Sequence, residues 1–251
     1  MPEIPYSFQT THRSVVRQTE ISPSPRLEPS YVARNNKADL SQFDHLARTY
    51  CLMEHLAFGR ALERARFEYF GHLKNCRRIL LLGDGDGRGL ARACQAAPNA
   101  RIDYVDLSTK MSAQARHRID SKDRNRVQFR NENVLTAHYE NDTYDAVTTL
   151  FFLDCFHPEQ IQVIIRRVRP ALKSNALWLH SDFRIPSSGW QSLRARAWLF
   201  VIYAFFRWQT GMTVTSLPSL EILFSEANFA CNKQTTYQHG FLQSGIFIQA
   251  D

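Results

Sequence analysis

The sequence predicts an α/β domain of the doubly wound kind, in which helices cover both faces of a mostly parallel sheet. Its 251 residues, 44% of them hydrophobic, fit one globular domain with a packed core. From Arg77 onward, short apolar runs alternate with helical patterns of roughly ten to fifteen residues, as in sheets joined by crossover helices. A glycine-rich bend follows the first of these runs.

The N-terminal part of the chain differs from the rest. Half of the ten prolines fall in the first 29 residues, and no helical or strand period is present there, so residues 1–36 are predicted to form a flexible tail. From Asp39 to Phe67, apolar residues recur at spacings of three and four, which indicates one or two amphipathic helices with Asp39 or Ser41 as N-cap. We expect residues 37–76 to form a helical lid on the main domain, residues 77–251.

Seven apolar runs in the main domain predict strands. They cover residues 79–82, 102–105, 127–129, 146–153, 176–180, 235–237 and 241–248. The last two are close enough to form an antiparallel hairpin with Gly240 at its turn. Five βα units followed by this hairpin give a three-layer αβα arrangement.

Composition excludes several other classes. The net charge of +7 comes from arginines scattered along the chain, without the aromatic-interleaved basic stretch of a nucleic-acid-binding surface. The five cysteines, an odd number without a C-x-x-C pair, argue against a disulfide framework or a zinc site. No secretory signal is evident, so we expect a reduced, cytoplasmic protein; an organellar transit peptide is the alternative.

The bend at residues 83–89 is the most informative segment, because it has glycine at every second position between a strand and a helix. Such a bend lets a ligand approach the backbone and the helix N–H groups. The dinucleotide pattern G-x-G-x-x-G fails, since Arg88 and Leu90 occupy the sixth positions, and no Walker A sequence is present. Asp84 and Asp86 would repel a pyrophosphate, which favours a cationic ligand. A turn that serves only packing is the alternative.

Three further strand ends are expected at the same edge of the sheet, where ligands of open α/β sheets bind. Asp106 ends the second strand and is suited to accept hydrogen bonds from ribose hydroxyls; the alternative is a helix N-cap near Ser108. Asn133 and Val134, after the third strand, suit the edge and face of an adenine. Together with the end of the fourth strand, these positions predict a site for a nucleoside.

Four segments together resemble the class I methyltransferases that depend on S-adenosylmethionine. They are LLLGDGDGRG, VDLSTKM, YDAVTTLFFLD and RRVRPALKSNALWLHSDF, and the resemblance extends from about Asp39 to Asp251. It is strongest to the small-molecule branch that includes the quinone-biosynthesis enzymes. The resemblance implies a Rossmann-like sheet of seven strands with one antiparallel strand, S-adenosylmethionine as cofactor, and methyl transfer to a small, apolar or aromatic acceptor.

The resemblance also assigns cofactor contacts. The matching positions are Gly83, Gly85 and Gly87 for the methionine part, Asp106 and its neighbour Leu107 for the ribose, Asn133 and Val134 for the adenine, and Leu150 beside the cofactor. One position departs from the family, because Leu81 stands where an acidic residue is usual. Asp84 is the candidate to supply that charge to the cofactor's ammonium group.

The sequence leaves the catalytic residues unknown. Asp154, His157, His180 and Asp182 lie near predicted strand ends and are candidates for a base. No metal cluster is indicated, and Asp145 and Asp182 are interpreted as strand-end caps. An Asn/Asp-Pro-Pro-aromatic sequence does not follow the fourth strand, which disfavours acceptors with amide or adenine nitrogens.

Residues 193–208 are expected to form a helix that contains the apolar, aromatic run from Trp198 to Phe206, bounded by Arg196 and Arg207 and too short to span a bilayer. We expect it to line the pocket of a lipophilic acceptor and to contact a membrane surface through its arginines; a buried helix or a dimer contact is the alternative. Tyr50 is a candidate to fold over the cofactor or, equally, to pack in the core.

Two other functions remain open. A catalytically silent module that binds a nucleoside on the same fold is compatible with the departure at Leu81. An RNA methyltransferase is less favoured, because the basic residues are dispersed. The sequence does not determine the oligomeric state.

Overall fold

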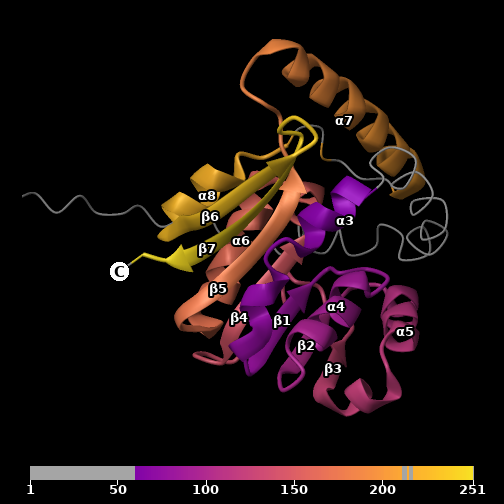
Figure 1. The fold of residues 1–251 in the computed structure, drawn as a ribbon, viewed down its shortest axis with the longest axis vertical. Coiled ribbons are helices and arrows are strands. Elements are labelled where there is room, and N and C mark those ends of the chain that lie inside the picture. The colour runs from indigo at the N-terminus through magenta and orange to yellow at the C-terminus, as the bar shows by residue number, and fades with distance from the viewer. Residues whose placement is uncertain (1–59, 211–213, 215–216, 251) are drawn as a thin grey trace, which may run out of the picture.

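The computed structural model of the protein describes residues 60–210, 214 and 217–250, with side chains except at 205–210. Its centre is a seven-stranded sheet in the order β3-β2-β1-β4-β5-β7-β6 (Figure 1). The strands are β1 (Arg78–Leu82), β2 (Arg101–Val105), β3 (Val127–Arg130), β4 (Tyr144–Leu150), β5 (Leu172–Phe183), β6 (Phe229–Tyr237) and β7 (Leu242–Gln249). Strand β7 runs antiparallel to both of its neighbours, β5 and β6, and all other neighbouring strands are parallel. The predicted three-layer fold is confirmed.

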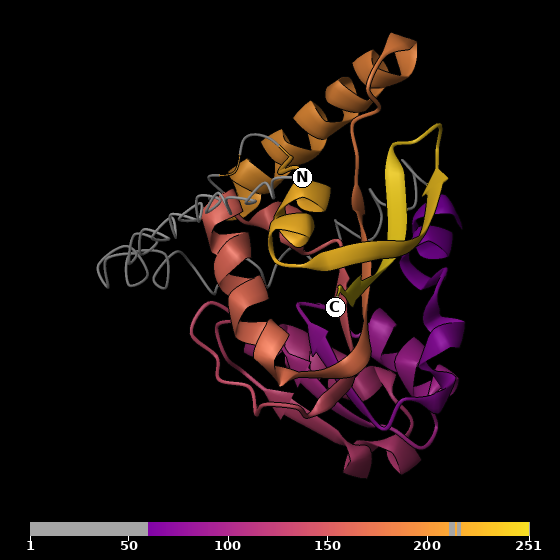
Figure 2. The ribbon, with the colours of Figure 1, turned by 90° about the vertical axis from the view of Figure 1, so that its left-hand side faces the viewer.

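Helices cover both faces of the sheet (Figures 1 and 2). One face carries α3 (Arg60–Phe67), α4 (Arg88–Ala96) and α5 (Thr109–Arg118), and the other carries α6 (Pro158–Val168) and α8 (Leu220–Glu226). Short 3-10 helices are η1 (Phe70–Asn75), η2 (Ser121–Arg126), η3 (Leu153–Cys155) and η4 (Arg169–Ala171). Helix α7 (Gly189–Thr210) follows β5 and stands out from the body of the molecule. No helix in the described part of the chain is both long and apolar enough to cross a bilayer.

The core follows from the alternation of side chains along buried strands. In β1, Leu80 and Leu82 face the layer of α6, whereas Ile79 and Leu81 face the layer of α4. Leu81, the residue that departs from the family pattern, is completely buried under α4. The hydrophobic side chain at this position therefore contributes to packing.

Helix α3 is attached directly to the far half of the sheet. The hydroxyl of Ser181 in β5 donates to the carbonyl oxygen of Ala65 at 2.9 Å, and the hydroxyl of Ser244 in β7 donates to the same oxygen. Leu62 and Ala65 pack in a separate apolar cluster with Phe183. Of the predicted lid, residues 60–75 are thus largely helical, while the predicted tail, Tyr50 and the start of the lid lie outside the described residues.

Several strand boundaries differ from those predicted. Strand β4 ends at Leu150, because Phe151 has a φ of 54°, a left-handed conformation that breaks the strand. Strand β5 is 12 residues long and includes polar residues at its start. Strand β6 begins at Phe229, earlier than predicted, because its exposed edge carries few apolar side chains from which a strand could be predicted. The predicted hairpin between β6 and β7 is present, with Gly240 in its turn at a φ of 83°.

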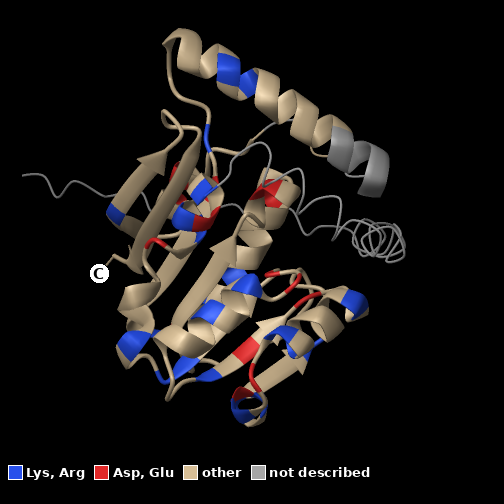
Figure 3. Cartoon of the chain, turned by 45° about the vertical axis from the view of Figure 1, so that its right-hand side comes forward, with Lys and Arg blue, Asp and Glu red and all other residues tan. Residues whose placement is uncertain are grey.

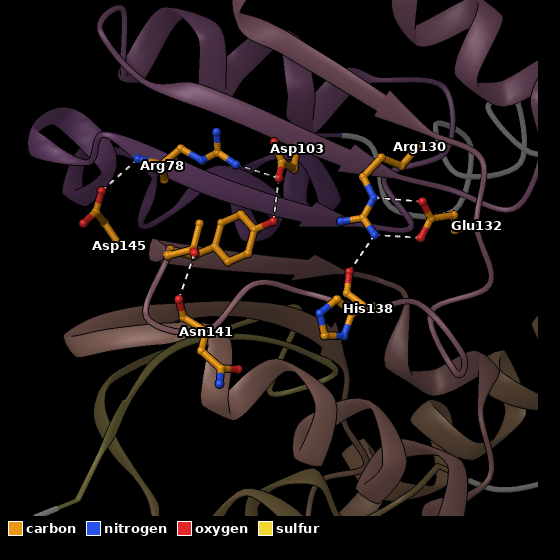
Figure 4. A network of polar contacts seen from close by, with 9 residues as sticks. Arg78, Asp103, Arg130, Glu132, His138, Asn141 and Asp145 are labelled. Atoms are coloured by element: carbon orange, nitrogen blue, oxygen red, sulfur yellow. Dashed lines mark hydrogen bonds and ion pairs between the residues drawn. The ribbon is translucent and has the colours of Figure 1, made fainter.

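The amino ends of four strands are joined by a polar network (Figure 4). The Arg78 guanidinium lies 3.1 Å from Asp103 Oδ2, and the Tyr144 hydroxyl donates to the same carboxylate. Asp145 accepts the backbone N–H of Arg78 at 2.8 Å and pairs with Lys173 at 2.8 Å. These contacts support the interpretation of Asp145 as a strand-end cap. They also leave the opposite, carboxyl end of the sheet as the place for a ligand.

Candidate functional site

The glycine bend after β1 is shaped mainly by contacts within the protein. A Cβ atom on Gly83 would lie 2.0 Å from the ring of Phe152, and one on Gly87 would lie 2.5 Å from Ala115. Gly85, at a φ of 63°, differs, since no atom of the described residues lies within 4 Å of its Cβ position. Gly83 and Gly87 therefore allow close packing, whereas Gly85 has free space beside its Cα atom.

Asp84 holds the start of α4. Its Oδ1 accepts the N–H of Gly89 at 2.9 Å and its Oδ2 accepts the N–H of Leu90 at 2.7 Å, which satisfies two of the free amides of the first helical turn. Burial raises the pKa of Asp84 to about 7, although these amides and the charge of Arg66 act in the opposite direction. Asp84 is therefore only partly ionised near neutral pH.

Asp86 is neutralised by two arginines. Its carboxylate lies 2.7 Å from Arg118 Nη2 and 3.3 Å from Arg88 Nε, and Arg118 Nε donates to its backbone carbonyl at 2.9 Å. With Asp84 bonded to helix amides, the bend is much less negative than the sequence indicates. The repulsion of a pyrophosphate inferred from these two carboxylates is correspondingly weakened.

Asp106 connects the end of β2 to the bend. Its Oδ2 accepts the N–H of Gly85 at 3.1 Å, and its Oδ1 accepts the N–H of Ser108 at 2.9 Å. Ser108, rather than Asp106, is the N-cap of α5, because its hydroxyl accepts the N–H of Met111 at 3.2 Å. Burial raises the pKa of Asp106 to about 6. Each of its oxygens keeps a lone pair for a further hydrogen bond, and Leu107 beside it is exposed.

The loop after β3 brings Asn133 and Val134 to the same end of the sheet. Arg130 fixes this loop through a two-point contact with Glu132, at 3.0 and 2.7 Å, and a bond to the carbonyl of His138 at 2.7 Å (Figure 4). The side-chain oxygen of Asn133 accepts the N–H of Leu135 at 2.9 Å, and Val134 is buried in the core. The oxygen of Asn133 therefore already has a local partner.

Two residues beside the bend were not singled out from the sequence. The Tyr104 hydroxyl of β2 donates to the carbonyl of Gly85, the glycine with free space beside its Cα atom. Arg66 of α3 is buried, with its guanidinium carbon 5.3 Å from the centre of the Phe151 ring. Arg66 lies four residues after Leu62, on the apolar face of a predicted helix, and this position was the signal in the sequence that Arg66 is buried.

The ends of β4 and β5 bring three of the four candidate bases together. The N–H of Asp154 donates to Asp182 Oδ2 at 3.2 Å, and His180 Nε2 lies 4.0 Å from the same oxygen. His157 is instead the N-cap of α6. Leu150 is buried at the end of β4, and its Cδ1 would lie 2.9 Å from a Cβ on Gly89.

No group of three metal-ligating side chains occurs among the described residues. A hollow of about 430 Å³ lies between the start of α7 and the turn of the β6–β7 hairpin. Its lining includes Arg184, Gln191 and His239, and none of the predicted cofactor contacts. The predicted nucleoside site at the bend therefore lies apart from this hollow.

Comparisons with known proteins agree with this architecture. Residues 79–175 match the model of a family described as a methyltransferase domain. A search of curated protein sequences finds no match.

Three solved structures illustrate the shared fold. The 1,6-didemethyltoxoflavin-N1-methyltransferase of Burkholderia thailandensis, with bound 1,6-didemethyltoxoflavin and S-adenosylhomocysteine, has a TM-score of 0.60 and 16% identity over 92% of this chain and 94% of its own. An O-methyltransferase family protein from the same organism has a TM-score of 0.64 and 18% identity over 89% and 67%. The mitomycin 7-O-methyltransferase MmcR has a TM-score of 0.60 and 16% identity over 88% and 66%.

Proposed function

We propose, from the premise that this chain is a methyltransferase that uses S-adenosylmethionine, that it methylates a small, lipophilic acceptor. The premise rests on the methyltransferase-domain match over residues 79–175 and on the fold shared with methyltransferases, one of which holds the product S-adenosylhomocysteine. The acceptor class is supported by neighbours named for toxoflavin-type and mitomycin substrates. A quinone-like aromatic acceptor is the form that the sequence resemblance favours.

The observation that carries the proposal is the junction of Gly85 and Asp106. A glycine with free space beside its Cα atom and a carboxylate with unused lone pairs lie side by side, joined by a hydrogen bond of 3.1 Å. These two residues fit the amino-acid and ribose parts of the cofactor, with Leu107, Asn133, Val134 and Leu150 as further contacts. S-adenosylmethionine, when bound, supplies a methyl group activated by a sulfonium.

Asp84 has a different role in this proposal from the one expected from the sequence. Because both of its oxygens bond to α4 amides, we assign it to holding the helix N-terminus against the cofactor. A contact with the cofactor's ammonium group would need the remaining lone pairs of the same oxygens.

The lipophilic character of the acceptor is supported by α7, which is apolar on both sides. Ala195, Leu199, Ile202 and Tyr203 are buried against the body, while Leu193 and Phe200 are 73% and 76% exposed. Residues 183–220 contain four arginines and no acidic residue. In Figure 3, α7 accordingly carries blue, basic positions and no red, acidic position. An apolar stripe flanked by arginines fits the surface of an anionic membrane, from which α7 would collect its acceptor.

Calorimetric titration with S-adenosylmethionine, S-adenosylhomocysteine and NAD tests the proposed function. We expect both adenosyl compounds to bind and NAD to fail. Methylated product from a lipid extract incubated with labelled S-adenosylmethionine would then distinguish an enzyme from a silent binding module. Binding of NAD alone would overturn the assignment.

A further inference from the structure

Two buried aspartates at the carboxyl ends of β4 and β5 have no role in the cofactor site proposed above. Asp154 in η3 is 6% exposed and Asp182 near the end of β5 is 1% exposed. Asp182 accepts the N–H of Phe183 at 2.9 Å and that of Asp154 at 3.2 Å. The Cys155 thiol donates to Asp154 Oδ1 at 3.6 Å. These bonds fix the pair, but they supply no positive charge.

Within the described part of the chain, no cation compensates the charge of the pair. Among the described residues, neither carboxylate forms a salt bridge with a lysine or arginine, and His180, at 4.0 Å from Asp182, is the one basic group in contact. Burial lowers the pKa of His180 to about 4, so this imidazole is neutral, with its Nδ1 hydrogen-bonded to the Thr149 hydroxyl at 3.1 Å. Burial raises the pKa of both carboxyls, and the charge of Asp154 raises that of Asp182 further, so the two groups do not ionise independently.

Tyr203 of α7 closes this cluster with an unsatisfied hydroxyl. Its side chain is 4% exposed, and its hydroxyl has no hydrogen-bond partner among the described residues. Tyr203 packs in the same apolar cluster as Phe183, the residue that follows Asp182, and this packing places Tyr203 beside the pair. Burial, followed by the charges of Asp154 and Asp182, raises the pKa of Tyr203. A buried hydroxyl without a partner is rare in folded proteins and needs an explanation.

The cluster adjoins the cofactor site. Strand β4 pairs with β1, and Phe152, two residues before Asp154, lies with its ring against Gly83 of the bend. The cluster is thus next to the methionine end of the cofactor site, at the strand ends where a doubly wound sheet binds ligands. The buried apolar residues of α7 pack with Phe183, which follows Asp182 in the chain.

We propose that Asp154, Asp182 and Tyr203 form the polar subsite that receives the N–H or O–H group of the acceptor and takes up its proton. This inference rests on the proposed function. The acceptor's N–H or O–H bond breaks, its proton goes to the ionised carboxyl of the pair, and its electron pair forms the bond to the methyl carbon while the C–S electrons remain on sulfur. The Tyr203 hydroxyl, free of other partners, orients the acceptor atom. Because the pair and Tyr203 are buried, α7 has to shift for the acceptor to enter.

A probe that needs no identified acceptor tests this subsite. Sinefungin resembles S-adenosylhomocysteine but carries an amino group, with N–H bonds and a positive charge, where the methyl group is transferred. We expect wild-type protein to bind sinefungin more tightly than S-adenosylhomocysteine in calorimetric titrations. Asp154→Asn and Asp182→Asn should each weaken sinefungin by about tenfold, the size of a lost charged hydrogen bond, and leave S-adenosylhomocysteine within about twofold.

The controls separate failure of this inference from failure of the proposed function. Tyr203→Phe removes only the hydroxyl and should weaken sinefungin by about threefold, on the scale of a neutral hydrogen bond. Asp103→Asn changes a buried carboxylate at the opposite end of the strands and should leave the ratio of the two affinities unchanged. Equal effects on both ligands, or none, would overturn the subsite while leaving the function intact. Loss of S-adenosylhomocysteine binding by the wild type would overturn both.

Discussion

The ring of Phe152 occupies the space beside Gly83 into which any other residue would project its Cβ atom, at a separation of 2.0 Å. Gly85, two positions later, has the same left-handed backbone and no such neighbour. One bend thus contains a glycine required by the protein's own packing and a glycine with free space beside its Cα atom. The two are natural controls for each other.

Alanine at these two positions should separate stability from binding. Both Gly83→Ala and Gly85→Ala incur about 1 to 2 kcal/mol of left-handed backbone strain. Gly83→Ala adds the overlap with Phe152, for about 1 to 3 kcal/mol more, so it should unfold at lower urea concentration. Gly85→Ala should mainly weaken S-adenosylhomocysteine in calorimetry. Equal unfolding midpoints for the two variants would contradict this assignment.

Asp106→Ala is expected to lower cofactor affinity by about 1.5 to 3 kcal/mol, because a charged hydrogen-bond acceptor for the ribose is lost. It should also lower the free energy of unfolding, since the amides of Gly85 and Ser108 lose their partner. Calorimetry and urea unfolding measure the two effects separately. If stability falls and S-adenosylhomocysteine binds as before, Asp106 only braces the bend, and the ribose contact lies elsewhere.

Asp84 should make stability depend on pH. Its pKa is about 7 in the folded chain against 3.8 ordinarily, so between about pH 4 and pH 7 the folded state holds a proton that the unfolded state has lost. The free energy of unfolding therefore falls as pH rises through this window, by at most about 1.4 kcal/mol per unit for this group, and levels off above pH 7. Asp84→Asn should give a shallower fall from pH 5 to pH 7 in urea titrations. Parallel curves for variant and wild type would refute the prediction.

The exposed stripe of α7 should bind anionic membranes. Wild-type protein is expected to sediment with phosphatidylglycerol vesicles more than with phosphatidylcholine vesicles, and the double variant Leu193→Ser, Phe200→Ser should lose this binding without losing stability. Ile222→Ser, on α8, is the matched control, because its side chain is 57% exposed on another helix. Failure of the wild type to bind either vesicle would rule out the membrane role.

The sequence predicted the number and succession of the strands well, because buried parallel strands appear as apolar runs, as from Ile79 to Leu82. It predicted edges poorly. Most of β6 was not predicted, because the residues from Ala230 to Gln234 lie on an exposed edge strand and have no apolar pattern. The length of β4 was overestimated, because nothing local indicates the left-handed conformation of Phe151.

The sequence did not predict the hydrogen-bond and ion-pair partners of the candidate site residues. Asp84 and Asp86 looked alike in the bend, yet one bonds to α4 amides and the other to Arg118, which is 32 residues away in the chain. Asp154 and Asp182 were separate candidates, 28 residues apart, until the strand ends brought them together. Such pairings depend on tertiary packing, which short-range patterns do not contain.

The double serine contact on Ala65 bears on how the protein can be shortened. A recombinant fragment starting at residue 77, the predicted domain boundary, would remove the acceptor shared by Ser181 and Ser244. It would also expose the apolar surface of Phe183 that Leu62 and Ala65 cover. Expression trials should therefore keep the chain from residue 60 onward, and trimming beyond that point should yield aggregated material.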